Sequence, residues 1–177
     1  MRKVNFKFRF RTGFTLIEIL VYIAILGILM TVIFSFLIWA NSTNIKAKVM
    51  RETLEDASRT MEFMVREIKA AKSIYTPTTD SDQLSLETTK YLSNGEATTY
   101  IDFFLCGSQI CLKKESEAPL ALTKENVQVN NLVFTQISTG EIPSVQIELG
   151  VNYKSPSNKP EYRAIVNLTS TASLRAY

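Results

Sequence analysis

The sequence contains no histidine, only two cysteines, and only six glycines and five prolines in 177 residues. Without histidine, neither a Ser-His-Asp nor a Cys-His nucleophile can form, and no metal site can have a histidine ligand. Two cysteines are too few for a zinc knuckle but enough for one disulfide. The sequence also has no glycine-rich phosphate loop and no paired-carboxylate signature. We therefore expect a protein that is not an enzyme and that uses no cofactor and no metal.

Acidic residues are missing from the N-terminus as far as Glu18. The first 13 residues hold five of the 20 Lys and Arg and none of the 17 Asp and Glu, which leaves 15 basic and 17 acidic side chains in the remainder. Nucleic-acid binding would require a basic surplus on the folded part, and there is none. We therefore infer no direct nucleic-acid binding, and we expect the basic excess to orient a membrane segment.

The longest hydrophobic run, residues 19–40, has no charge and no proline. At about 1.5 Å per residue, such a helix spans roughly 33 Å, which is enough to cross a bilayer. The basic residues before it predict a cytoplasmic N-terminus and an extracytoplasmic remainder, in a single-pass protein of the inner (cytoplasmic) membrane. In a secretory signal the cleavage site follows the apolar run, whereas here the plausible processing point, Gly13, precedes it. An uncleaved signal anchor is the alternative.

The helix is expected to continue beyond the membrane, because no glycine or proline occurs between Gly27 and Pro77. We predict one helix of about 60 residues over 14–74, ended by Thr76-Pro77. Its second half carries an apolar stripe at spacings of three and four residues. The stripe comprises Ala47, Met50, Leu54, Ala57, Met61, Met64, Ile68 and Ala71. A sheet of the same chain is expected to cover it, and a coiled-coil partner is the alternative.

Two oppositely charged pairs on other faces of this helix have the favourable i,i+4 spacing, Glu55 with Arg59 and Glu62 with Arg66. We expect both to form.

After Pro77 the apolar period changes to two, which is typical of strands. Strands are expected in residues 80–88, 98–106, 110–113, 127–137 (interrupted by a turn or bulge at Asn130-Asn131), 145–153 and 164–169. The last two read as an antiparallel hairpin, because the connection between them is rich in proline and serine. The predicted fold class is α+β, with a long N-terminal helix packed on an antiparallel β-sheet.

The segment from Cys106 to Cys111 has the composition of a hairpin tip. If Ser108-Gln109 forms the two-residue loop, the cysteines face each other and a disulfide is possible. If Gly107-Ser108 forms the loop, we expect Cys106 to face Gln109 and the cysteines to miss each other. Glycine at the first loop position favours the second arrangement, whereas an extracytoplasmic location favours the disulfide.

Four acidic residues of the β-rich region, Asp80, Asp82, Glu87 and Glu96, raise the question of calcium. Their spacing does not match an EF-hand loop, so we interpret them as solvated charges.

Residues Gly13-Phe14-Thr15-Leu16-Ile17-Glu18, preceded by a basic leader and followed by an apolar run, resemble the prepilin motif of type IV pilins and type II secretion pseudopilins. The resemblance implies that a prepilin peptidase cleaves between Gly13 and Phe14 and methylates the new Phe14 amine. It also implies that Glu18 contacts the N-terminal amine of a neighbouring subunit during assembly. Ser35 departs from the family, since many major pilins carry proline there, and this favours a minor or pseudopilin-like subunit. The region around residues 59–71 is loosely similar to J-type pseudopilins.

The resemblance implies a structural subunit of a type IV pilus-like filament or of a secretion pseudopilus. Its partners would be the prepilin peptidase, other pilin or pseudopilin subunits, the inner-membrane assembly platform and membrane lipid. Adhesion or motility pili, DNA uptake and secretion all remain open as its machine. The expected organisation is a cleaved leader (1–13), a transmembrane helix (14–40), its amphipathic continuation (41–75) and a β-sheet region (76–177). The alternative function is a membrane-anchored extracytoplasmic binding module that joins no filament.

Overall fold

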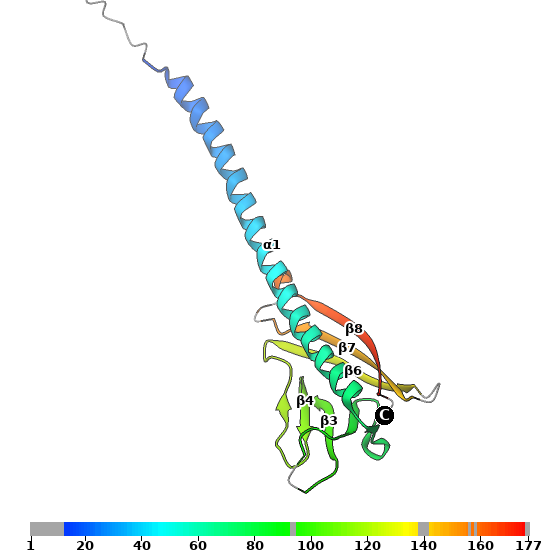
Figure 1. Cartoon of the computed structure of the whole chain (residues 1–177). Coiled ribbons are helices and arrows are strands. Elements are labelled where there is room, and N and C mark those ends of the chain that lie inside the picture. The colour runs from blue at the N-terminus through cyan, green and yellow to red at the C-terminus, as the bar shows by residue number, and fades with distance from the viewer. Residues whose placement is uncertain (1–12, 93–94, 138–141, 156, 158, 176–177) are drawn as a thin grey trace, which may run out of the picture. The chain divides into compact units, whose positions relative to one another are not determined.

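The computed structural model describes residues 13–92, 95–137, 142–155, 157 and 159–175. One long helix, α1 (Leu16–Ala70), is followed by eight strands and two short 3-10 helices, η1 (Thr76–Thr78) and η2 (Pro160–Tyr162) (Figure 1). The chain forms two compact units, residues 1–42 and residues 43–177, and α1 contributes to both. We call them the first and the second unit.

In the first unit, α1 is long and apolar enough to cross a membrane, and none of its most apolar window is buried by protein. Two hydroxyls of the apolar run, residues 19–40, are bonded to the helix itself. Thr31 Oγ1 donates to the Gly27 carbonyl and Ser35 Oγ donates to the Thr31 carbonyl, both at 2.9 Å. This back-bonding satisfies polar groups that lipid cannot satisfy. The apolar helix therefore suggests membrane anchoring.

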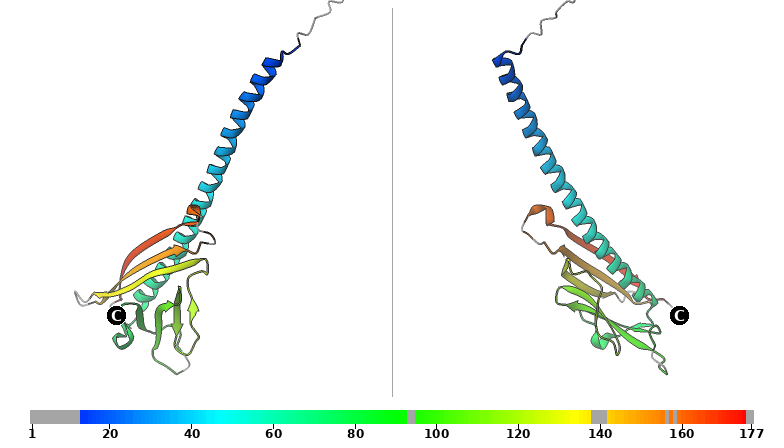
Figure 2. Two further views of the ribbon diagram at one scale, coloured as in Figure 1. Left: turned by 180° about the vertical axis from the view of Figure 1, so that it is seen from behind. Right: turned by 90° about the vertical axis from the view of Figure 1, so that its left-hand side faces the viewer.

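The second unit packs the C-terminal half of α1 on antiparallel strands, which confirms the predicted α+β class (Figures 1 and 2). The strands form two sheets where one was expected, with orders β1-β2-β3-β4-β5 and β6-β7-β8. Their bounds are Ser73–Ile74 (β1), Gln83–Thr88 (β2), Thr99–Cys106 (β3), Gln109–Lys114 (β4), Leu120–Ala121 (β5), Val127–Ile137 (β6), Ser144–Tyr153 (β7) and Ile165–Ser173 (β8). The two-residue strands β1 and β5 were not predicted, because they are too short to show a period.

The three-stranded sheet matches the sequence expectation closely. β7 and β8 pair as the predicted antiparallel hairpin, and Val145, Ile147, Leu149 and Val151 of β7 are buried. The register of β6 on β7 shifts between Val129 and Asn131, which confirms a bulge at the predicted interruption. Opposite the bulge, a Cβ built on Gly150 would lie 2.6 Å from Asn130 Oδ1, so the close approach of these side chains requires glycine.

The apolar stripe on α1 is only partly covered. Ala57, Met61, Met64, Ile68 and Ala71 enter the core, as expected of a helix covered by its own chain. At the start of the stripe the prediction is wrong, because Ala47 is exposed, Met50 is 40% exposed and Leu54 is 45% exposed. There the buried side chains are Val49, Thr53 and Asp56. The sheets therefore cover a face that includes polar residues, which an apolar period cannot identify.

The helix ends earlier than predicted. It stops at Ala70, before Thr76-Pro77, because the chain then pairs with β2. The Lys72 N–H donates to the Glu87 carbonyl at 2.8 Å and the Tyr75 N–H donates to the Ser85 carbonyl at 2.9 Å. The sheet therefore binds the backbone amides that a longer helix would have used. Strand pairing outweighs the helix propensity of this segment.

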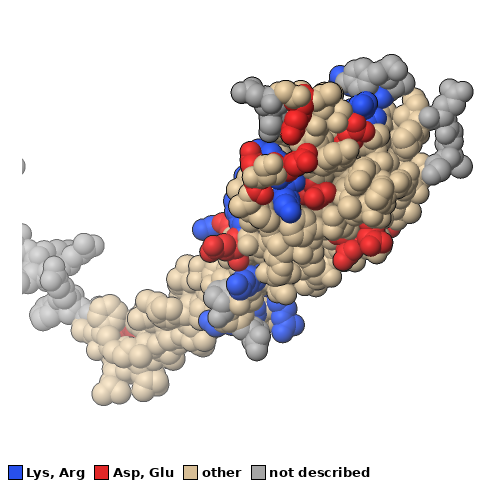
Figure 3. Space-filling model, turned by 90° about the horizontal axis from the view of Figure 1, so that it is seen from below, with Lys and Arg blue, Asp and Glu red and all other residues tan. Residues whose placement is uncertain are grey.

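The second unit carries both signs of charge side by side. On the face in view in Figure 3, Lys and Arg are interspersed with Asp and Glu, and the N-terminal part of α1 is almost free of charged atoms.

Candidate functional site

The segment Gly13–Glu18 lies at the start of α1. Gly13, Phe14 and Thr15 precede the helix, which begins at Leu16, two residues later than predicted. Thr15 caps it, because Thr15 Oγ1 accepts the Glu18 N–H at 3.3 Å and the Thr15 carbonyl accepts the Ile19 N–H at 3.2 Å. The pattern Thr-x-x-Glu is that of a capping box, which fixes the first turn of a helix. Thr15 therefore stabilises the first turn of the helix, in which Glu18 lies.

Glu18 is the one acidic residue in the first turn of α1. A carboxylate there is favoured by the helix dipole, which is positive at its N-terminus. Among the described residues no cation lies within ion-pair distance of this carboxylate, and the first cation after it in the sequence is Lys46. The Glu18 side chain is half-buried, whereas its neighbours on the helix are exposed.

Phe14 is 70% exposed, yet its ring contacts the helix that follows. Its centroid lies 6.4 Å from that of Tyr22 in an edge-to-face arrangement with an interplanar angle of 76°. Aromatic pairs prefer this geometry. The capping role of Thr15 and the contact of Tyr22 with Phe14 were not predicted, although the Thr-x-x-Glu spacing indicates the cap.

In the second unit, Cys106 and Cys111 are joined by a disulfide with a Cα–Cα distance of 5.8 Å. The register is the one in which Cys106 faces Gln109, and Gly107 has a φ of 66° in the two-residue loop. Our expectation that this register separates the cysteines is wrong. Cys106 and Cys111 are diagonal neighbours on one face of the hairpin, and their spacing lies in the usual disulfide range.

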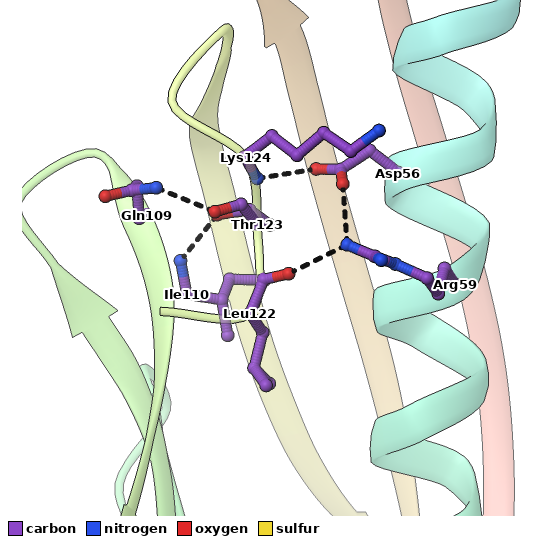
Figure 4. Close-up of polar contacts among 7 residues, drawn as sticks. All are labelled: Asp56, Arg59, Gln109, Ile110, Leu122, Thr123 and Lys124. Atoms are coloured by element: carbon purple, nitrogen blue, oxygen red, sulfur yellow. Dashed lines mark hydrogen bonds and ion pairs between the residues drawn. The ribbon is translucent and has the colours of Figure 1, made fainter. Parts of the chain in front are cut away.

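A buried carboxylate on α1 connects the helix to the β5–β6 connection (Figure 4). Asp56 is 1% exposed; its Oδ2 accepts the Lys124 N–H at 3.1 Å and its Oδ1 accepts from Arg59 Nη2 at 3.3 Å. The neighbouring Thr123 binds the β3–β4 hairpin, since its Oγ1 accepts the Ile110 N–H at 3.2 Å. Asp56 is thus a structural anchor, which the apolar pattern does not predict because Asp56 is a polar residue on a covered face.

Neither predicted i,i+4 pair is formed among the described residues, so both expectations are wrong. Arg59 binds Asp56 rather than Glu55, because the same guanidinium also donates to the Leu122 carbonyl at 3.5 Å. Arg66 lies 5.0 Å from the Phe63 ring centroid and 3.7 Å from Glu67. Contacts with the sheets and with aromatic rings therefore determine where these side chains lie.

The four acidic residues considered as calcium ligands do not form a metal-binding cluster among the described residues. Among the described residues no group of three or more His, Cys, Asp or Glu side chains could hold a metal ion. Glu87 instead accepts hydrogen bonds from Ser73 Oγ at 2.6 Å and Lys72 Nζ at 3.0 Å. These two bonds, the Ser73 bond first, hold the pKa of Glu87 below its usual 4.5.

Comparison with known proteins identifies the N-terminal segment. Residues 9–34 match a family model described as the prokaryotic N-terminal methylation motif. The match starts within the basic leader and extends into the apolar part of α1. No curated protein and no solved structure matched the chain. The family that carries this motif is structural rather than enzymatic. The motif, together with a long N-terminal helix packed on antiparallel sheets, supports placing the chain with the type IV pilin and pseudopilin-like proteins.

Proposed function

We propose that the chain is a minor pilin or pseudopilin, a subunit that assembles through α1 into a type IV pilus-like filament or a secretion pseudopilus. The observation that carries the proposal is the methylation motif at residues 9–34, which implies processing by a prepilin peptidase. Cleavage between Gly13 and Phe14 removes the basic leader and keeps the apolar helix as an anchor. Methylation of Phe14 then leaves a positively charged secondary amine at the new N-terminus.

Glu18 is the assembly residue in this proposal. After cleavage it is the fifth residue of the mature chain, at the edge of an apolar segment without another charge before Lys46. A carboxylate among packed apolar helices is costly unless it is paired. The N-terminal amine of Phe14 on a neighbouring subunit is a cation at the same depth. Pairing the two neutralises both charges and fixes the axial register of one subunit against the next.

The basic leader orients the anchor. Its five cations precede the apolar run, so the positive-inside rule keeps the N-terminus in the cytoplasm and places the second unit outside the inner membrane. The prepilin peptidase, sibling subunits and the assembly platform are partners that follow from this location.

Substitutions of Glu18 test the assembly role. Glu18→Gln removes the charge but keeps a side chain suited to the capping box, and Glu18→Ala removes both. We expect both variants to be cleaved like the wild type, and the fraction recovered in filaments to fall about tenfold or more, which corresponds to a loss of at least about 1.4 kcal/mol. Thr15→Ala, which weakens the cap alone, is the matched control and should assemble. Normal incorporation of Glu18→Gln would show that charge pairing does not drive assembly.

A further inference from the structure

The three-stranded sheet has two edges, and among the described residues only the β6 edge makes backbone hydrogen bonds to the rest of the second unit. At the β6 edge, the Val129 N–H donates to the Ser108 carbonyl at 2.9 Å and the Phe134 N–H donates to the Ser81 carbonyl at 2.7 Å. β8 pairs with β7 alone, and in the part of the chain that the structure describes no backbone hydrogen bond leaves its other side. Figure 1 shows β8 as the outer strand.

The register of the hairpin determines which groups face this open edge. The Tyr153 N–H donates to the Ala164 carbonyl at 3.0 Å and the Leu174 N–H donates to the Pro143 carbonyl at 3.1 Å. Even-numbered residues of β8 therefore bond to β7. Because backbone groups alternate sides along a strand, the N–H and C=O of the odd-numbered residues point away from β7. These residues are Ile165, Asn167, Thr169, Thr171 and Ser173, and all five side chains are exposed.

β8 lacks the features that protect most edge strands. Its nine residues contain no charge and no proline, and its register on β7 has no bulge. Native sheets usually blunt an exposed edge with lysine, proline, a bulge or a short strand, and a typical strand has about five or six residues. An open, uncharged edge of this length is a template for another strand.

Cations flank the open edge. Arg163 and Arg175 are exposed and continue the alternation at the two ends of β8. Arg175 also lines a cavity of about 540 Å³ with Arg66, Lys69 and Lys90. Its lining includes one carboxylate, Glu62, and the buried Glu67 beside it is already bound by Lys90 at 3.1 Å. The end of β8 at Arg175 therefore favours an acidic side chain.

A second copy of this chain fits the edge poorly. Antiparallel pairing of two β8 strands about Thr169 would place Arg163 opposite Arg175 at both ends. Like charges directly opposite each other destabilise a strand pair.

We propose that the open edge of β8 binds an extended segment of another protein by strand addition, and that this segment carries an acidic side chain at the end beside Arg175. Main-chain hydrogen bonds to the five odd-numbered residues supply the affinity, and the flanking cations set the register. The proposal concerns the second unit alone, so it stands or falls independently of cleavage at Gly13 and of assembly through Glu18.

The experiment measures amide hydrogen exchange, residue by residue, in the full chain in detergent micelles. The probe is a blocked nine-residue peptide of alternating threonine and valine with glutamate at both ends. On binding, exchange at the five odd-numbered β8 amides should slow about tenfold or more, while the even-numbered amides, already bonded to β7, change less. A peptide with lysine at both ends should bind about two- to fivefold more weakly, as expected of exposed charge pairs.

Matched variants separate strand addition from other binding. Thr169→Pro removes the central N–H that faces the open edge and no bond to β7, and proline is tolerated on edge strands. It should weaken binding about tenfold or more, whereas Thr169→Val, which keeps the N–H, should bind within about twofold of wild type. A probe N-methylated on the amides that face β8 makes the same test without altering the protein.

Three results would overturn the proposal: odd-numbered amides unprotected at saturating peptide, equal binding of the N-methylated peptide, or equal binding of the lysine-ended peptide. Protection of the same amides without peptide, rising with protein concentration as a dimer forms, would instead place a second copy at the edge and would also overturn it.

Discussion

At the scale of single residues, two carboxylates on α1 are governed by different surroundings. Glu18 has no cation among the described residues within ion-pair distance, whereas Asp56 is enclosed by an amide and a guanidinium of its own unit. Asp56 holds the helix to the segment before β6, and we propose that Glu18 pairs with the N-terminal amine of a neighbouring subunit. Burial and hydrogen bonding, rather than residue type, distinguish the two.

Removing the Asp56 carboxylate should destabilise the second unit. Asp56→Ala leaves the Lys124 N–H and the Arg59 guanidinium without their acceptor, so the free energy of unfolding should fall by about 1.5–3 kcal/mol. Urea titration of the full chain in detergent, followed by circular dichroism, measures the change. The exposed neighbour Glu55 is the control, and Glu55→Ala should stay within about 0.5 kcal/mol of wild type. Equal effects of the two variants would contradict the anchor role.

The contribution of Glu87 to the free energy of unfolding should decrease as the pH falls. Because Ser73 and Lys72 hold the folded-state pKa below 4.5, the stabilisation is fully present above about pH 4.5 and is lost as pH falls through the lowered pKa. The difference in unfolding free energy between wild type and Glu87→Gln should therefore shrink between about pH 5 and about pH 3. Urea titrations across this range test it, with Glu96→Gln, an exposed residue, as the control. A constant difference would show that ionisation of Glu87 is not responsible.

At the scale of elements, the sequence predicts the strands better than the helix surface. The alternation in β7 and β8 and the interruption in β6 correspond directly to pairing and a bulge. The helix boundary at Ala70 and the exposure of Leu54 could not be predicted, since each depends on strands far away in the sequence. A local sequence pattern indicates which residues are apolar, but it does not indicate which face of the helix a sheet will cover.

Alanine substitutions at two positions of the predicted stripe should have different effects on the free energy of unfolding. Met64 is fully buried in the core and Leu54 is 45% exposed. Met64→Ala should lower the free energy of unfolding by about 2–5 kcal/mol through lost burial and the cavity left behind. Leu54→Ala should change it by about 0.5 kcal/mol. Thermal or urea unfolding of the two variants provides the comparison, and equal losses would mean that the whole stripe is covered.

The stability of the β3–β4 hairpin tip should depend on the disulfide between Cys106 and Cys111. We predict that protein isolated from cells is lighter than the reduced chain by the mass of two hydrogen atoms. Replacing both Cys106 and Cys111 by serine should lower the unfolding free energy by about 2 kcal/mol, at the low end of the usual range because the closed loop is short. Exchange at the Ile110 and Val129 amides, which bond at or near the tip, should accelerate. Free thiols in the isolated protein would contradict the prediction.

At the scale of the whole molecule, the N-terminal segment is the part whose function the sequence predicts most fully. The reversed order of leader, glycine and apolar run is visible without a structure, and the methylation motif at residues 9–34 agrees with it. The cap by Thr15, the open edge of β8 and the cations around Arg175 became visible only once the fold placed these residues. The proposed processing thus depends on local sequence, whereas the proposed binding edge depends on tertiary structure.

The most direct test of prepilin processing is the mass of the N-terminal peptide of the protein extracted from membranes of cells with an active prepilin peptidase. We expect a mature chain that begins at N-methyl-Phe14 and lacks residues 1–13. A chain that retains Met1 and the basic leader in those cells would contradict it.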